Sequence, residues 1–271
     1  MVRRSALSML ALSVPAMALT FSGPGIEAAF AADDGPGFYV RAGVGLERST
    51  DATFSDRNCA SVSPPALFGC VEGPGGQSIG GRGDFGQSIA VEGAIGFRPL
   101  PTLRLEAVLA HRPSFAFSGN ANFLGIQGRQ PVDGDASTTS AMVFGYLDIA
   151  PMLEADLGRF EPFIGAGFGV ARNAIGDVTY SFPDHTNTGY SRTSGGSRTN
   201  PAWAITAGTG VRLAESLVLD VSYRYSDYGR VQTDPGPLNV VRETFDVTID
   251  IDATEAHLAS HAAMTSLRYA F

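Results

Sequence analysis

Four short segments of this 271-residue chain have residue types whose spacing could do chemistry, and the most regular is the acidic stretch at residues 245–252. Its carboxylates, on Asp246, Asp250 and Asp252, could be offered to Ca²⁺. Calcium loops need ligands that converge from a tight turn, often with Gly. Here the carboxylates spread along one face of an extended segment, so the pattern favours a β-strand over a calcium site.

The Gly-rich segment at residues 73–82 and a histidine pair are weaker signals. No Gly-Lys-Ser/Thr follows the glycines and no helix opens there, so the segment does not fit a phosphate-binding loop and is predicted to be a mobile loop. Of the four histidines, His257 and His261 share one face of an alternating segment, whereas Ser260 points to the other. No Ser/His/Asp arrangement or nucleotide fingerprint is present. We therefore expect neither a catalytic centre nor a cofactor.

The N-terminus has the pattern of a secretory signal. A positively charged start, Arg3-Arg4, precedes a stretch of mostly apolar, small residues at 6–21. Ala29-Phe30-Ala31 then supplies small residues at the two positions that a signal peptidase requires. We predict cleavage after it, so residues 1–31 are a signal peptide and residues 32–271 form the mature domain. The alternative is a retained N-terminal membrane anchor.

The two cysteines, Cys59 and Cys70, are close together in the chain. An exported chain meets an oxidising compartment, which favours a disulfide between them. Closing a loop of this size stabilises the fold by roughly 2–3 kcal/mol. No further ligands flank the cysteines at the spacing of a metal site, so we expect a loop staple.

The charge balance is acidic. The chain has 19 Lys and Arg and 27 Asp and Glu, and removal of the signal leaves 19 − 2 = 17 basic and 27 − 1 = 26 acidic residues, a net charge of −9. Such a balance gives no electrostatic reason to expect nucleic-acid binding.

The elements that must position these residues are strands, because apolar residues recur with period two. In the first alternating segment, for example, Val40 and Val44 lie opposite Arg41 and Glu47. In the fourth, Met142 falls on the polar side with Phe144. Each segment is about long enough for a tilted membrane span of ~9–11 residues. The eight segments lie at residues 38–48, 85–98, 103–112, 140–149, 160–172, 202–213, 217–228 and at the C-terminal end of the chain.

Connection lengths alternate. Those at residues 99–102, 150–159 and 214–216 are short, and the others are long. This alternation puts the termini and the short turns on one side, as in membrane barrels. The predicted fold class is therefore all-β: an eight-stranded antiparallel up-and-down transmembrane β-barrel with long extracellular loops. In such a fold the acidic stretch would be a strand that extends past the membrane.

Charged residues of both signs occupy the face away from the apolar stripe. The lumen of an eight-stranded barrel is only wide enough to be filled by side chains, and an unpaired buried ion costs several kcal/mol. We therefore predict a plug of ion pairs, with a solute path as the alternative. Arg41 or Arg104 is predicted to bridge the two glutamates of the plug. The plug residues are Arg41, Glu92, Arg104, Glu106, Asp220 and Arg224.

The signal peptide and four motifs together resemble the small outer-membrane β-barrel family, especially the transmembrane domain of OmpA-like and opacity-type surface proteins of alphaproteobacteria. The motifs are Val40-Arg41-Ala42-Gly43-Val44-Gly45, Pro162-Phe163-Ile164-Gly165-Ala166-Gly167, Tyr223-Arg224-Tyr225 and Leu267-Arg268-Tyr269-Ala270-Phe271. The resemblance covers residues 38–271. It implies the bacterial outer membrane as location, with its lipid and lipopolysaccharide as surroundings. It also implies that Tyr269 and Phe271 form the signal read by the barrel-assembly machinery. Because the chain stops at its last strand, the peptidoglycan-binding domain of OmpA is not expected.

The resemblance favours a structural, surface-exposed protein that is not an enzyme, with loops that meet a host surface or a phage. One alternative is a small porin. Another is a lipid A-modifying barrel, since certain such barrels use Ser and His that face the outer leaflet. Here Ser260 lies on the opposite strand face from the two histidines, and the His-x-Ser-Asn signature of the deacylase group is absent. Tyr223, Tyr225 and Trp203 fit an aromatic belt at the level of the lipid headgroups better than a ligand site.

Overall fold

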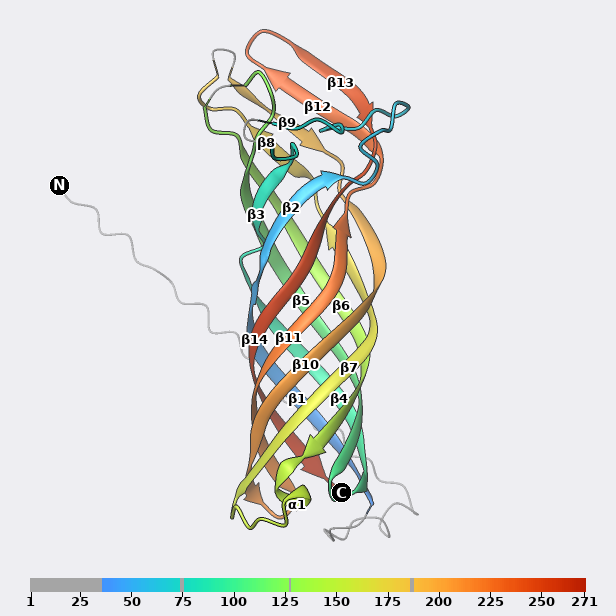
Figure 1. Ribbon diagram of the computed structural model, residues 1–271, viewed down its shortest axis with the longest axis vertical. Helices are drawn as coiled ribbons and strands as arrows, with labels where there is room; N and C mark the ends of the chain where they lie inside the picture. Colours follow the sequence, from blue (N-terminus) through green and yellow to red (C-terminus); the bar gives the residue numbers. More distant parts are fainter. Residues whose placement is uncertain (1–35, 74–75, 127, 186–187) are drawn as a thin grey trace, which may run out of the picture.

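The computed structural model describes residues 36–73, 76–126, 128–185 and 188–271. Within them, eight long antiparallel strands pair in sequence order and close into a ring, since the last strand pairs with the first (Figure 1). The predicted barrel is confirmed, while the predicted signal peptide lies outside the described residues. The ring strands are β1 (Gly37–Ser49), β4 (Gln87–Leu100), β5 (Leu103–Ala121), β6 (Pro131–Asp148), β7 (Phe160–Ile175), β10 (Gly196–Ala214), β11 (Leu217–Gln232) and β14 (Thr254–Ala270).

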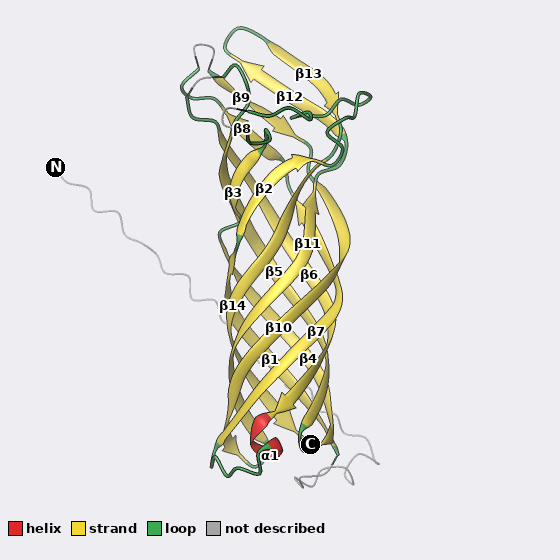
Figure 2. Ribbon diagram, in the orientation of Figure 1, coloured by secondary structure: helices red, strands yellow, loops and turns green. Residues whose placement is uncertain are grey.

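The short connections lie at one end of the barrel, where the C-terminus also lies (Figure 2). Two residues join β4 to β5 and two join β10 to β11, whereas the connection from β6 to β7 contains the short helix α1 (Ile149–Met152). In the part of the chain that the structure describes, no helix has the length and apolar character needed to cross a membrane. The predicted alternation of short and long connections is confirmed in part: residues 122–130 between β5 and β6 are fewer than residues 149–159 between β6 and β7, because β5 and β6 extend beyond their predicted ends. The two-residue turns identify this end as the periplasmic one.

Most ring strands are longer than predicted, whereas β4 keeps its predicted length and is shifted by two residues. They contain 13 to 19 residues, whereas a tilted membrane span needs about 9–11. The fourth strand begins at Pro131, nine positions before the predicted start. The prediction stopped where apolar residues ceased to alternate, but strand pairing continues into the region where both faces meet protein or water.

The predicted long extracellular loops are present, and three of the four contain strands; the described residues between β5 and β6 contain none. β2 and β3 fill the wall between β14 and β5, and four strands extend the wall from β6 in the order β8, β9, β12, β13. We call these six strands and their connections the cap. They are β2 (Asp51–Asp56), β3 (Gly81–Asp84), β8 (Val178–Ser181), β9 (Gly189–Thr193), β12 (Gly236–Arg242) and β13 (Asp246–Ile251).

Two further predictions fall within the cap. The acidic stretch forms β13, so its assignment as a strand is confirmed, although Asp252 and Ala253 separate it from β14. The assignment of the Gly-rich segment as a loop is wrong at its C-terminal end, where β3 begins at Gly81. Here β3 pairs so closely with β5 that a Cβ on Gly83 would lie 2.1 Å from the Ser118 carbonyl oxygen.

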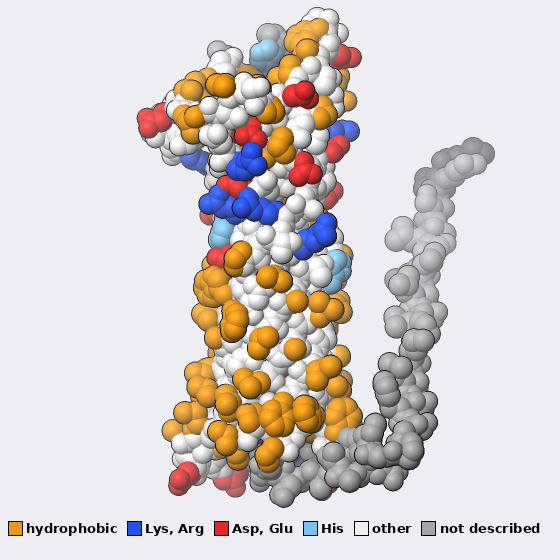
Figure 3. Space-filling model, turned by 90° about the vertical axis from the view of Figure 1, so that its right-hand side faces the viewer, with side chains coloured by type: hydrophobic (Ala, Val, Ile, Leu, Met, Phe, Trp, Pro, Cys, Tyr) orange, Lys and Arg blue, Asp and Glu red, His pale blue; other side chains and the backbone are white. Residues whose placement is uncertain are grey.

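The outer surface divides into two zones. On the face shown in Figure 3, hydrophobic side chains gather over the lower barrel, and charged and histidine side chains lie above them. The predicted faces are confirmed: Phe38, Ile95 and Phe168 point outward and are more than half exposed, whereas Glu92 and Glu106 are buried. The lower zone is the belt of the barrel that faces hydrocarbon.

Candidate functional site

Arg41 of β1 lies at the centre of the lower lumen. Its guanidinium donates to Glu106 of β5, with Nη2 2.7 Å from Oε2, and its Nη1 contacts Glu92 of β4. Arg224 of β11 donates from Nη1 to the second Glu92 oxygen at 2.6 Å, and the Tyr39 hydroxyl donates to Glu106 at 2.9 Å. Thus Arg41 contacts both glutamates, and residues from four strands meet in one network.

A second layer lies toward the periplasmic end. Arg104 contacts Asp148 at 2.9 Å, and therefore does not bridge the two glutamates. Arg268 contacts Asp220 at 3.2 Å and Glu161 at 2.9 Å, and the more exposed Arg212 at the rim contacts the same glutamate. Most of these pairs join neighbouring strands, and the Arg268–Glu161 pair spans the lumen from β14 to β7.

A third layer lies above Arg41, around Glu47 of β1. Arg112 donates to its carboxylate at 2.8 Å, Ser260 at 3.0 Å and the Tyr228 hydroxyl at 3.2 Å. Arg112 also donates to the Ser140 hydroxyl at 3.1 Å. Glu47 was not among the predicted plug residues, although its alternating position on β1 placed it on the same face as Arg41.

The buried charges of these three layers balance. Among the described residues, the three layers contain five buried arginines and five buried acids, so their net charge is 5 − 5 = 0. The space between the side chains is small: a void between the Arg41 and Arg104 layers has a volume of about 10 Å³, roughly that of one water. The ten residues are Arg41, Arg104, Arg112, Arg224, Arg268, Glu47, Glu92, Glu106, Asp148 and Asp220.

Aromatic rings fill the lumen between the charges. The Arg104 guanidinium lies 4.9 Å from the centre of the Tyr146 ring and 5.0 Å from that of Phe163. The Arg224 guanidinium lies 4.9 Å from the Phe144 ring. Cation–π contacts of this kind are strongest where water is excluded. The contact with Arg224 explains why Phe144 occupies the polar face of β6, and Met142 is buried in the lumen beside it.

Above the ionic layers the lumen becomes an apolar core. Phe54 of β2, Phe117 of β5 and Phe85, which precedes β4, are buried and pack ring against ring, with centroids 4.8 to 6.0 Å apart. Tyr180 of β8 is also buried there, and burial raises the pKa of its phenol, so it stays neutral. The same core continues through Val132, Ile175, Val178, Val231 and Leu258. This second plug was not predicted.

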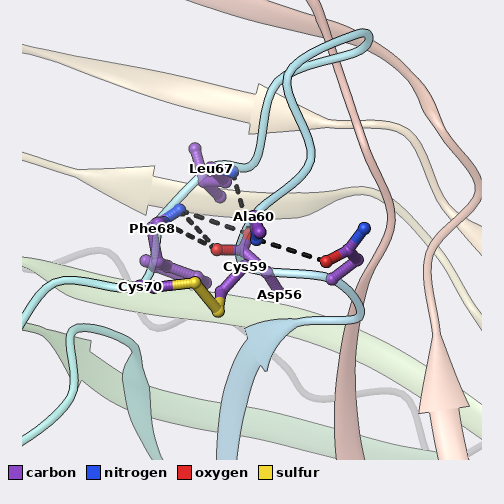
Figure 4. The surroundings of a disulfide bond; sticks show 8 residues. Asp56, Cys59, Ala60, Leu67, Phe68 and Cys70 are labelled. Carbon is purple, nitrogen blue, oxygen red and sulfur yellow. Dashed lines mark hydrogen bonds between the residues drawn. A yellow bond between two sulfur atoms is a disulfide. The ribbon is translucent and has the colours of Figure 1, made fainter.

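The disulfide closes a loop within the connection from β2 to β3, and this loop packs against the core. Cys59 and Cys70 are bonded, and between them the chain turns around Asp56 (Figure 4). The Asp56 carboxylate accepts hydrogen bonds from the backbone N–H groups of residues 67, 68 and 69, at 2.7 to 3.2 Å. The segment thereby holds Phe68 against Phe123 and Tyr180. The disulfide and the carboxylate together order the first extracellular connection.

A family model described as outer membrane protein beta-barrel domain matches residues 5–252. The chain belongs to this outer-membrane barrel family. It is therefore a protein of the bacterial outer membrane, and the location implied by the sequence resemblance is confirmed.

The individual proteins similar to this outer-membrane barrel share low sequence identity with it. A Rickettsia conorii protein named "Putative adhesin RC1281" is 25% identical over 146 residues, which cover 51% of this chain; the chain spans about half the length of that relative (50%). Neisserial surface protein A is 14% identical with a TM-score of 0.37, covering 88% of this chain and 99% of that one. OprG of Pseudomonas aeruginosa is 14% identical with a TM-score of 0.46, covering 87% and 96%.

The wall of the barrel separates Ser260 from His257 and His261. Ser260 is fully buried in the lumen, where it donates to Glu47, whereas His257 and His261 are exposed outside. His257 contacts Asp227 at 3.0 Å, and His261 lies 5.1 Å from the Tyr225 ring. Within the described residues, no group of three or more His, Cys, Asp or Glu is arranged to hold a metal.

The predicted assembly residues lie at the periplasmic end. Tyr269 of β14 faces outward and packs edge-on against Phe271, with centroids 5.2 Å apart. Phe271 follows the strand and donates its backbone N–H to the Phe38 carbonyl at 3.2 Å. The terminal aromatic pair therefore continues the apolar outer face of the last strand.

Proposed function

We propose that this outer-membrane barrel is a closed surface protein, whose membrane section stabilises the envelope and whose cap makes contacts outside the cell. The observation that carries the proposal is the double closure of the lumen. A charge-balanced ionic plug fills the membrane section, and an aromatic core fills the section above it. A solute would have to displace both.

The cap has the features of a binding surface. Its disulfide, the Asp56 carboxylate and the buried phenylalanines hold it in one arrangement, and a preorganised surface loses less entropy when it binds. Its tip exposes Phe245, Val247 and Ile249 around β13. Exposed apolar residues beside polar ones are typical of protein contact sites. The adhesin name of the Rickettsia conorii relative supports the same role.

Conductance tests the closed lumen. We expect purified barrel in planar bilayers to give no steady ion conductance. The variant Phe54→Ala/Phe117→Ala/Glu106→Ala, trimmed at both plugs, serves as the positive control for a leak. Steady conductance of the wild type that changes when Arg41 is replaced would establish a small porin instead.

Binding tests the role of the cap. Cells that display Val247→Ser/Ile249→Ser should bind host cells or phage less than cells that display the wild type, since both side chains are exposed at the tip. Glu215→Gln, at the exposed periplasmic turn between β10 and β11, is the matched control and should bind as the wild type does. Equal binding by the cap variant and the wild type would contradict the proposed surface role.

Non-enzymatic function is part of the proposal. A serine and a histidine that act together must lie within hydrogen-bond reach, and here the barrel wall separates them. Unchanged lipid A mass in cells that lack the protein is the expected result.

We also propose that Tyr269 and Phe271 direct assembly of the barrel in the membrane. Phe271→Ser should slow this assembly without changing the folded barrel.

A further inference from the structure

The hydrocarbon-facing wall has a groove across β4 to β7. Its open volume is about 710 Å³. The groove exists because small outward-facing residues, Gly93, Ala107 and Ala141, lie among large ones. A Cβ placed on Gly93 would meet no atom within 4 Å, so a larger side chain has room there. The larger residues at its sides are Ile95, Leu109, Val143 and Phe168.

Strand register places a polar row directly above this groove. Leu109, Ala141 and Val170 are register neighbours, and two residues further along each strand His111 pairs with Thr139 and Thr139 with Arg172. Two residues of strand correspond to about 7 Å. All three side chains point outward, and His111 Nδ1 lies 2.9 Å from Thr139 Oγ1. Arg172 donates from Nη2 to the Ser197 hydroxyl at 3.2 Å.

We propose that the groove and the row above it bind one molecule of phosphorylated, acylated lipid of the outer leaflet, with the chemistry of lipid A. An acyl chain lies in the groove, and a phosphate accepts hydrogen bonds from Arg172 and His111. The site is separate from the cap and does not depend on the proposed surface role.

Charge complementarity selects this occupant. The polar row carries an arginine and a histidine and no acid, and the next row, with Ser137 and Ala174, carries none either. Arginine is well suited to phosphate oxygens because its planar donors match them. The apolar groove lies in the hydrocarbon belt, where the molecules available to occupy it are acyl chains. A second copy of the barrel would need an apolar surface at the level where Arg172 stands.

The opposite face of the barrel supplies a matched comparison. Arg48 of β1 is also outward-facing, and it pairs in register with His261 of β14. Tyr223 and Tyr225 surround that histidine, with ring centroids 5.9 and 5.1 Å from it. This position has a similar charge at the same border of the membrane but aromatic rings in place of a groove.

The test uses full-length mature barrel in phosphatidylcholine nanodiscs doped with bisphosphorylated lipid A, with retained lipid counted by native mass spectrometry. We expect the wild type to retain one lipid A and to discriminate against its dephosphorylated form. Arg172→Gln should reduce retention about tenfold, the scale of one charge-assisted contact. Gly93→Leu should fill the groove and reduce retention of both forms. Arg48→Gln should retain lipid A as the wild type does.

Several outcomes would overturn the proposal. Equal retention of lipid A by Arg172→Gln and the wild type would show that Arg172 does not bind the phosphate. Loss of lipid by Arg48→Gln to the same extent would show general adsorption to the border and no site. Protein dimers that form without lipid and vanish in Gly93→Leu would assign the groove to a second copy. The gel mobility of unheated samples checks folding, and a folded Gly93→Leu barrel with full retention would also end the idea.

Discussion

The membrane section and the cap section of the same lumen are filled by opposite kinds of side chain. In the membrane section, Arg41, Glu92 and Glu106 are buried in an ionic network while apolar residues face outward. In the cap section, Phe54 and Phe117 are buried, and many polar residues face outward. The difference follows from the surroundings. Where lipid covers the outside, polar residues must be inside and paired; where water covers it, the interior is an ordinary apolar core.

The largest expected effect is in the ionic section. Glu92→Gln removes the partner of both Arg41 and Arg224, and leaving buried cations without it should destabilise the barrel by ~3–5 kcal/mol. Chemical unfolding in detergent micelles measures the change. Glu215→Gln, at an exposed turn, is the control. A barrel with unchanged stability would mean that the ionic plug is hydrated and not a structural seal.

The next effect is in the cap section. Phe54→Ala leaves a cavity in the aromatic core, since Phe54 is fully buried, and should cost about 3 kcal/mol. The loss should be local: limited proteolysis should cut the cap faster, while the lower barrel keeps its resistance to unfolding in detergent. Val62→Ala, at an exposed cap residue, is the control. Simultaneous unfolding of both sections would show that they form one cooperative unit.

The disulfide should have a smaller, local effect. Cys59→Ser/Cys70→Ser opens a loop with a sequence separation of 11, which should reduce cap stability by ~2–3 kcal/mol. Faster proteolysis between residues 57 and 70 is the expected result, with the ionic section unaffected. The contrary result is an equal rate for the oxidised protein and the variant, in which case the Asp56 hydrogen bonds alone hold this segment.

The smallest effect concerns Asp184 in the connection from β8 to β9. Its hydrogen bonds with Arg129 lower the pKa of its carboxyl. A lowered pKa in the folded state means that the pair stabilises fully above the unfolded pKa of about 4, and that this stability is lost as pH falls through the lowered folded pKa. Both side chains are substantially exposed, so solvent screens the pair. Asp184→Asn should lower the cap melting temperature slightly at neutral pH and by less as the pH is lowered toward ~3. A large change at neutral pH would contradict this.

Strand order and strand faces were predictable from the sequence because alternation is a local property. Val44 and Glu47 already differ in their side of β1 when only neighbours in the chain are compared. The candidate site residues were found in the same way, since Arg41, Glu92 and Glu106 all lie on the strand face that points into the lumen. Aromatic residues at lumen positions, such as Phe144, were harder to interpret, because they pack on arginines from other strands.

The apolar core could not be predicted from alternation because a bulge reverses the faces. Leu109 and Phe115 are an even number of residues apart, which predicts a common face. The irregularity in pairing between Arg112 and Phe115 turns the phenylalanine into the lumen. A similar irregularity between Asp227 and Arg230 brings Val231 inside. Each irregularity carries a local signal: Pro113 lies at the first, since proline in strands is confined to edges and bulges, and Gly229, with a φ of +73°, lies at the second.

What the sequence determined by itself is therefore the eight strands, their up-and-down order and the face of most residues, since each depends on near neighbours in the chain. The tertiary structure decided which charges meet: Arg41 contacts both glutamates, while Arg104 lies beside Asp148. It also decided how far the strands continue above the membrane and where the lumen turns apolar. These depend on the stagger of strands around a closed ring, which no single segment encodes.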